Sequence, residues 1–158
     1  MTSNQGKKFE LKFKEDWLKT IKNATSKDAF LLRLYDSTNG FVNISTPCDF
    51  IGFANGKLFL IECKSHNGAS IPLTAIPQYS RLLAYKDFEN IFPGIIVWFK
   101  DKDCVIWFPV ATIEKEIAKG KKSINYQIAD DVESGAIKLP GIKKRVFIDT
   151  DYSPLLDL

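Results

Sequence analysis

The sequence lacks the features that mark several classes of protein. Its three cysteines, Cys48, Cys63 and Cys104, are an odd number without a C-x-x-C pair, which argues against a disulfide framework and a zinc knuckle. No apolar run approaches the ~20 residues of a membrane-spanning helix. The polar N-terminal residues lead into lysines and not into the apolar stretch of a secretion signal. We therefore expect a soluble cytoplasmic protein.

Internal repeats, low-complexity tracts and Pro/Gly/Ser-rich linkers are also missing. The chain has 158 residues, of which 45% are hydrophobic and 26% charged, so it can bury one substantial core. Its net charge of +3 is compatible with a nucleic-acid partner but does not require one. We expect a single domain over residues 1–158.

Periodicity and turn signals predict an α/β protein. Apolar residues recur every four positions between Lys7 and Lys22, which predicts a helix whose aromatic side chains belong to the core. Asn55-Gly56 separates apolar runs at 48–53 and 57–64 and predicts a hairpin, and a second hairpin is predicted over 95–108. Further predicted elements are a strand over 29–35, helices over 75–86 and 111–119, and a strand near 145–148. This order favours a mixed sheet packed with helices.

The residues that point to chemistry lie around the first hairpin. Glu62 and Lys64 are two positions apart near the end of a strand, so both side chains project from one face. The hairpin also brings Asp49 close to Glu62. Burying such charges beside apolar surface is costly unless something compensates for them.

A hard cation compensates buried carboxylates well, and Mg²⁺ prefers carboxylate and carbonyl oxygens while keeping several waters. We therefore expect Asp49, Glu62 and the carbonyl of Cys63 to bind Mg²⁺, with Mn²⁺ as a substitute. Lys64 would hold or deprotonate the attacking water, or neutralise charge that develops on phosphorus. These residue types are suited to the hydrolysis of a phosphodiester, and Asp49, Glu62 and Lys64 are the expected catalytic residues.

Asp49, followed across a hairpin by Glu62-Cys63-Lys64, resembles the PD-(D/E)XK nuclease superfamily. More narrowly, the region from Gly6 to about Val110 is similar to resolvases of four-way (Holliday) DNA junctions, closest to the bacterial and phage RecU group. The resemblance implies a restriction-endonuclease-like fold, with a mixed β-sheet core flanked by helices. It also implies that Glu10 and Gln78 are further metal ligands.

The RecU group carries a long basic stalk before its catalytic aspartate, whereas here only Asp36 to Pro47 is available. The shorter archaeal-type resolvases are thus a comparable model, and their loop serine corresponds to Ser37 as a DNA contact. The resemblance implies a homodimer, because a two-fold junction needs paired cuts, and the apolar second hairpin offers a surface for that interface. The compact size suits a phage or mobile-element protein of a bacterial cell.

Several candidate residues have an ordinary structural alternative. Glu62 and Lys64 could form an ion pair at an exposed strand end, and Glu10 and Gln78 could be a solvated helix residue and a cap. The DNA-contact candidates could equally be ordinary surface residues. Arg33 would then face solvent from an edge strand, and His66, the only histidine, would lie in a surface loop. Lys121 and Lys122 could bind backbone phosphates or simply belong to a solvated loop.

Three functions follow from these residues. The first is a Mg²⁺-dependent endonuclease that resolves four-way junctions in branched DNA. The second keeps the fold but cuts duplex or flap DNA, as a repair or restriction-like nuclease would. The third is a non-catalytic DNA-binding module, which the complete set of two acids and a lysine argues against, because charges near a core are costly to retain.

Overall fold

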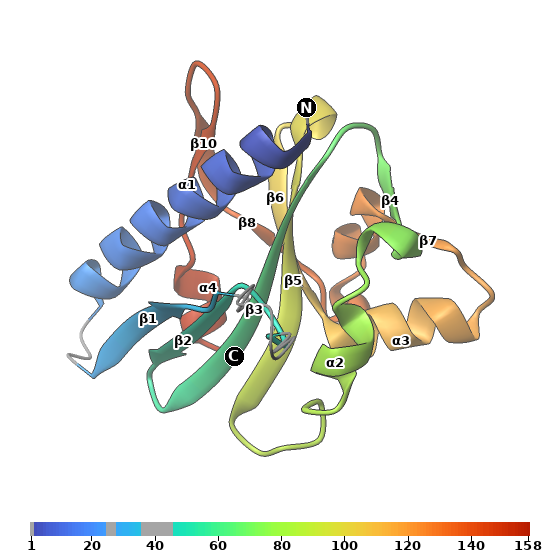
Figure 1. Ribbon diagram of the computed structural model, residues 1–158, viewed down its shortest axis with the longest axis horizontal. Coiled ribbons are helices and arrows are strands. Elements are labelled where there is room, and N and C mark those ends of the chain that lie inside the picture. The colour runs from blue at the N-terminus through green and yellow to red at the C-terminus, as the bar shows by residue number, and fades with distance from the viewer. Residues whose placement is uncertain (1, 25–27, 36–45) are drawn as a thin grey trace, which may run out of the picture.

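The computed structural model describes residues 2–24, 28–35 and 46–158 (Figure 1). Its centre is a six-stranded sheet in the order β1-β2-β3-β5-β6-β8. The strands are β1 Ala29–Arg33, β2 Phe50–Ala54, β3 Lys57–His66, β5 Ile91–Phe99, β6 Cys104–Pro109 and β8 Ile137–Leu139. β3 and β5 are parallel and the other neighbours are antiparallel, so the predicted mixed sheet flanked by helices is confirmed.

The first predicted hairpin is confirmed. Asn55 and Gly56 connect β2 to β3 with φ angles of 54° and 74°, as a two-residue turn with two left-handed positions requires. β3 then runs through the middle of the sheet, between β2 and β5. Its continuously apolar stretch follows from this position, because a central strand has side chains covered on both faces.

Helix α1, Thr2–Asn23, covers one face of the sheet. Phe9, Phe13 and Trp17 are buried there, and the Trp17 ring packs edge-on against Phe59 of β3, with ring centroids 5.5 Å apart. The four-residue spacing therefore identified the core stripe of this helix correctly. The structure also buries Asp16 of this helix, a residue that the apolar pattern did not single out.

The opposite face is covered by α2, Tyr79–Leu83, and α3, Val110–Ala118. The helix predicted over 75–86 is wrong in extent. A 3₁₀ turn at Leu73–Ala75 comes first, and Pro77, which has no N–H to donate, separates it from α2. After Leu83 the chain continues in tight turns, one of which is closed by the hydrogen bond from Tyr85 N to Leu82 O, 3.0 Å long.

The second predicted hairpin is confirmed and consists of β5 and β6. It does not offer the surface that was expected for a dimer interface. Residues 95–99 and 104–108 are all buried within the sheet, because β5 is flanked by β3 and β6 is flanked by β8. The expectation that this hairpin supplies a dimer interface is therefore wrong. Its apolar character reflects a central position in the core.

The C-terminal region is only partly as predicted. The strand expected near 145–148 is displaced to β10, Ile148–Thr150, which pairs with β9, Gly141–Lys143. The hydrogen bond from Lys144 N to Phe147 O, 2.8 Å long, closes the turn between them, so the intervening residues form a hairpin tip. Elements that the sequence did not predict are β4 Ser70–Pro72, which pairs with β7 Ser123–Asn125, the strands β8 and β9, the 3₁₀ turns Lys100–Lys102, Tyr126–Asp130 and Val132–Ser134, and α4 Ser153–Leu156.

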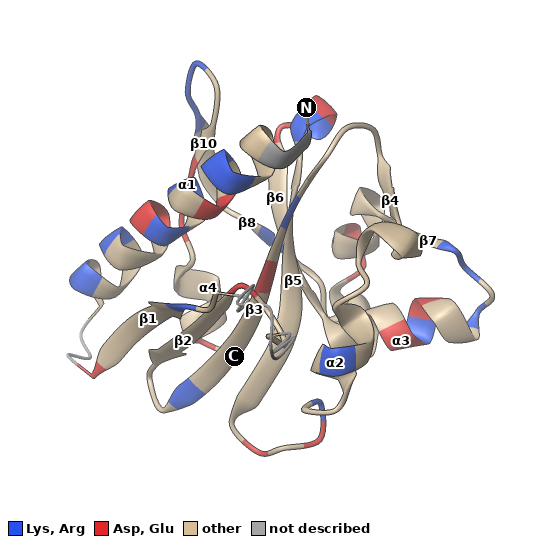
Figure 2. Cartoon of the chain, viewed as in Figure 1, with Lys and Arg blue, Asp and Glu red and all other residues tan. Residues whose placement is uncertain are grey.

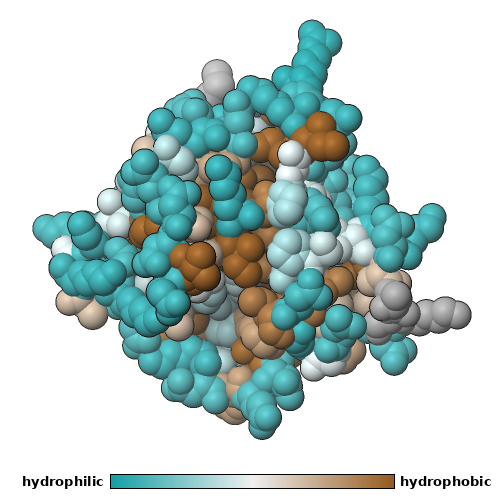
Figure 3. Space-filling model, turned by 180° about the vertical axis from the view of Figure 1, so that it is seen from behind, coloured by the Kyte–Doolittle hydropathy of each residue, from teal (hydrophilic) through white to brown (hydrophobic). Residues whose placement is uncertain are grey.

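Two expectations from composition bear on the interior and the surface. The three cysteines are free and buried; burial was expected for Cys63 and Cys104, which lie in apolar runs, but not for Cys48. No helix in the described ranges is long and apolar enough to cross a membrane. Seen from behind, the molecule has hydrophobic side chains near the middle of its surface, bordered by hydrophilic ones (Figure 3).

Candidate active site

The candidate site lies where β3 extends beyond β2. The last pair between these strands joins Phe50 to Ile61, whereas β3 continues to His66. Asp49 directly precedes Phe50, the first residue of β2. Its backbone N–H donates to Ile61 O at 3.1 Å, and its Oδ2 accepts a hydrogen bond from Cys63 N at 3.0 Å. A carboxylate thus replaces the strand that would otherwise cover this part of β3.

The backbone hydrogen bonds of successive β3 residues alternate between the β5 side and the β2 side. Leu58 N donates to Asn90 O on the β5 side, so even-numbered residues bond toward β5 and odd-numbered ones toward β2. Since a strand residue presents its N–H and C=O on the same edge, the carbonyl of Cys63 faces the opening beside Asp49. The side chains of Glu62 and Lys64 share the sheet face that α2 and α3 cover.

Glu62 is the most buried acid of this group, with 3% of its surface exposed. Lys64 Nζ lies 3.2 Å from its Oε1, and adjacent acidic and basic segments are visible along β3 (Figure 2). Burial raises the pKa of Glu62 to about 8; the negative charge of Asp49 adds to the rise and Lys64 opposes it. A carboxyl with a raised pKa beside a second acid is typical of functional sites.

Arg33 connects this group to helix α1. Its Nη2 lies 2.5 Å from Glu10 Oε2, and its Nη1 lies 3.4 Å from Asp49 Oδ1. Burial raises the pKa of Glu10, and the neighbouring Asp49 charge raises it further, while Arg33 lowers it. The guanidinium therefore holds two carboxylates near each other that would otherwise repel.

The role of Arg33 is the main feature that sequence reasoning missed. The pattern of β1 offered either a DNA contact or a solvent-facing side chain, whereas the structure places Arg33 between two acids. Its guanidinium also lies over the rings of Phe50, at 5.0 Å from the ring centroid, and Tyr35, at 5.5 Å. Arg33 is the last residue of β1, and nothing in the sequence paired it with Glu10.

The other predicted residues are not brought into contact with this group. Gln78 occupies the N-cap position of α2 without a side-chain capping hydrogen bond, and its Oε1 is buried without a hydrogen-bond partner among the described residues. His66 ends β3 and packs edge-on against Phe99. Lys121 and Lys122 are exposed in the basic loop between α3 and β7, away from β3 (Figure 2). Ser37 lies outside the described residues.

The donor set fits a divalent metal only in part. Within the described ranges, no three His, Cys, Asp or Glu side chains are arranged to hold an ion. Asp49, Glu62 and the Cys63 carbonyl are nevertheless adjacent oxygen donors, and Mg²⁺ needs few protein ligands because it retains water. Glu10 forms its ion pair with Arg33 through Oε2, and a carboxylate has a second oxygen that can bind a metal.

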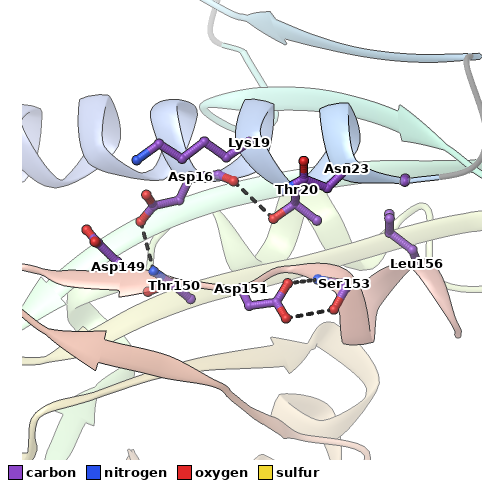
Figure 4. Close-up of a pocket in the computed structure, with 10 residues that line it drawn as sticks. Asp16, Lys19, Thr20, Asn23, Asp149, Thr150, Asp151, Ser153 and Leu156 are labelled. Atoms are coloured by element: carbon purple, nitrogen blue, oxygen red, sulfur yellow. Dashed lines mark hydrogen bonds between the residues drawn. The ribbon is translucent and has the colours of Figure 1, made fainter.

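A separate polar pocket of about 420 Å³ lies between α1 and the C-terminal segment (Figure 4). Its acids already have partners. Asp16 Oδ2 accepts from Thr150 N at 3.0 Å, and Asp151 accepts from both the backbone N–H and the hydroxyl of Ser153 at 2.9 Å. These contacts join chain segments, so this pocket has the character of a structural junction.

Comparison with known proteins supports the fold. None of the protein-family models and none of the curated protein sequences matches the chain. Among solved structures, Hjc from Archaeoglobus fulgidus, a Holliday junction resolvase from an archaeal hyperthermophile, matches with a TM-score of 0.58 and 15% identity. The match covers 84% of this chain and 95% of that one. The chain therefore shares the fold of this archaeal protein.

Proposed function

We propose that the protein is a metal-dependent endonuclease that hydrolyses phosphodiester bonds in branched DNA, with the four-way junction as its substrate. The observation that carries the proposal is the contact of Asp49, Glu62 and Lys64 at the open side of β3. The resemblance in fold to a Holliday junction resolvase supports the choice of substrate.

Each residue of the group has a role in this proposal. Asp49, Glu62 and the Cys63 carbonyl would hold Mg²⁺ or Mn²⁺. When bound, the metal supplies charge neutralisation at the phosphate and lowers the pKa of water. Lys64, fixed beside Glu62, would orient the attacking water and stabilise negative charge on phosphorus. Arg33 would keep Asp49 in place.

Paired cuts across a two-fold junction call for two copies of this site, so the proposal includes a homodimer. The β5–β6 hairpin is buried and does not supply the interface. Cross-linking or sedimentation of the protein with and without junction DNA measures the number of chains per complex. A complex with one chain per junction would contradict the dimer without affecting the proposed chemistry.

The direct test is cleavage of a labelled four-way junction and a linear duplex of matched sequence, each with Mg²⁺ or EDTA. We expect symmetrical nicks in the junction that EDTA abolishes. Asp49→Asn should lower the rate roughly 100-fold or more, because it removes a carboxylate that stabilises the transition state through the metal. Asp157→Asn, at an exposed position outside the site, is the matched control and should cleave normally.

The remaining outcomes separate the alternatives. Equal cleavage of junction and duplex would keep the nuclease site and replace the resolvase with a nuclease for duplex DNA. Junction binding without metal-dependent nicking would instead indicate a non-catalytic binding module. Cleavage that persists in Asp49→Asn would show that the proposed group is not the active site.

A further inference from the structure

A second feature beside the acids points to what the substrate strand must look like. We propose that the pocket between α1 and β1 binds one unpaired nucleotide of the substrate strand, with its base stacked on Tyr35 and its flanking phosphates on Lys7 and Lys14. This inference rests on the proposed function and adds the part of the DNA that this side of the site would recognise.

The pocket adjoins the candidate active site directly. It has a volume of about 400 Å³ and shares Glu10, Arg33 and Phe50 with the group described above. Such a volume is at the lower end of small-ligand pockets, about 300–1,000 Å³, and suits one nucleotide. A nucleotide held here would be a near neighbour of a phosphate that reaches Asp49, because Arg33 contacts both the pocket and Asp49.

The pocket offers a surface for stacking. The Arg33 guanidinium contacts the rings of both Phe50 and Tyr35, with its central carbon 5.0 and 5.5 Å from the ring centroids, and it forms an ion pair with Glu10. Tyr35 is 77% exposed, so much of its ring is open to solvent. A base that stacks on Tyr35 would add aromatic stacking to the cation–π contact that Arg33 already makes with this ring.

The charges around the pocket favour phosphate. Lys7 and Lys14 lie two helical turns apart on the side of α1 that faces the pocket, and both are exposed. Neither forms an ion pair with another described residue, and the one acid that lines the pocket, Glu10, is neutralised by Arg33. Two ammonium groups without an ion-pair partner among the described residues therefore line the pocket together with Tyr35, and both are available to phosphates.

The stacking surface selects against intact duplex. In double-stranded DNA each base is stacked on its neighbours, so a protein ring reaches a base face only when that base is unpaired or turned out. Where strands part at a branch point, a base loses a stacking neighbour, so turning it out costs less than within continuous duplex. The pocket would therefore distinguish a splayed strand from continuous duplex through Tyr35, independently of the overall shape of a junction.

The test is binding and photo-cross-linking of the full-length protein in EDTA, where no cleavage is needed. A junction and a matched duplex carry 5-iododeoxyuridine at the branch point and at the equivalent duplex position. We expect near-ultraviolet light to cross-link the junction base to Tyr35, identified by mass spectrometry, and the duplex base to give no such product.

Three variants measure the contribution of the pocket. Tyr35→Ala should weaken junction binding roughly tenfold, which is about 1.4 kcal/mol, and change duplex binding less than twofold. Tyr35→Phe keeps the ring and should bind as the wild type does. Lys14→Ala should lower the slope of log affinity against log salt by roughly one unit, whereas Lys22→Ala, on the same helix but outside the pocket, should leave it unchanged.

The outcomes separate this inference from the proposed function. Equal junction binding by Tyr35→Ala and wild type, or a cross-link at another residue, would overturn the inference even if the wild type cleaves junctions. A cross-link at Tyr35 with the expected loss in Tyr35→Ala would support it even if cleavage failed, in which case only the proposed chemistry would fall.

Discussion

At the scale of single residues, Glu62 is the side chain whose environment conflicts most with its charge. It is almost completely buried, a second carboxyl lies beside it, and Lys64 alone compensates. An apolar or neutral residue would stabilise this position better, because an ionised buried carboxylate carries a large desolvation cost. Such a conflict is expected where the charge serves chemistry and not stability.

This conflict gives a pH-dependent prediction. The pKa of Glu62 is about 8 in the folded chain and near 4.3 when unfolded, so between these values the folded state holds more protons. Stability contributed at this position is therefore present at low pH and is lost as pH rises toward 8. Glu62→Gln should match the wild type near pH 4.5 and exceed its melting temperature near pH 8.5.

Thermal unfolding of both proteins across this pH range measures the effect. Each kcal/mol should appear as roughly 2–4 °C in a chain of this size. Asp157→Asn, an exposed change outside the site, should show no such pH-dependent difference. A constant difference between Glu62→Gln and wild type at all pH values would contradict the assigned cause.

At the scale of elements, the approach of β5 to β6 depends on one residue without a side chain. Gly94 pairs with Pro109, and a Cβ atom at Gly94 would lie 2.4 Å from the Trp107 ring and 2.7 Å from the carbonyl oxygen of Phe108. The carbonyl oxygen belongs to the backbone, so no side-chain rotation can relieve this clash. The two strands would have to separate locally to accommodate any larger residue.

We therefore expect Gly94→Ala to destabilise the protein by about 3 kcal/mol or more, a loss typical of overpacking that also shifts the backbone. Gly6→Ala is the matched change, since nothing lies within 4 Å of a Cβ there. It should stabilise α1 by about 0.5–1 kcal/mol. Urea unfolding of both variants measures the difference, and a wild-type midpoint for Gly94→Ala would show that the strands are less tightly packed.

Elements with strong local signals could be predicted, and those set by partners could not. Asn55-Gly56 and the aromatic spacing of α1 determine their structures from adjacent residues, so both predictions were confirmed. The short α2 depends on Pro77 and on turns after Leu83, and the β9–β10 hairpin has little apolar alternation. Neither segment has the regular apolar spacing from which a helix or a strand is predicted.

The candidate site divides in the same way. Asp49, Glu62 and Lys64 could be placed together because one short hairpin connects them. The position of Arg33 between Glu10 and Asp49 requires α1, β1 and the start of β2 to be docked, and no local pattern predicts such an arrangement. The Tyr35 pocket was missed for the same reason, although Lys7 and Lys14 flank Glu10 on one side of α1.

At the scale of the whole molecule, the two ends of the chain are fastened together by a buried charge. Asp16 on α1 accepts hydrogen bonds from Thr150 N in β10, at 3.0 Å, and from Lys12 Nζ, at 2.7 Å. Lys12 in turn reaches Asp149 at 2.6 Å. The C-terminal segment is thereby fixed on the helix that also carries Glu10.

Asp16→Ala should cost about 1–3 kcal/mol, because it leaves the Thr150 N–H without its buried acceptor, while Lys12 keeps Asp149. Asp16→Asn keeps an acceptor for Thr150 and should cost less. Limited proteolysis reports where the loss occurs, since the exposed hairpin tip at Lys144 and Arg145 offers trypsin sites. Faster cleavage there in Asp16→Ala is expected, and cleavage at the wild-type rate would contradict this role.

The hydrogen bond from Cys63 N to Asp49 Oδ2 has a spectroscopic consequence. Most amides of β3 donate to carbonyls of neighbouring strands, whereas this one donates to a carboxylate. Its proton chemical shift depends on the charge of that acceptor, because a hydrogen bond to an ionised group is shorter and stronger. A single backbone resonance would therefore register whether Asp49 is free, protonated or occupied by a cation, without any label placed at the site.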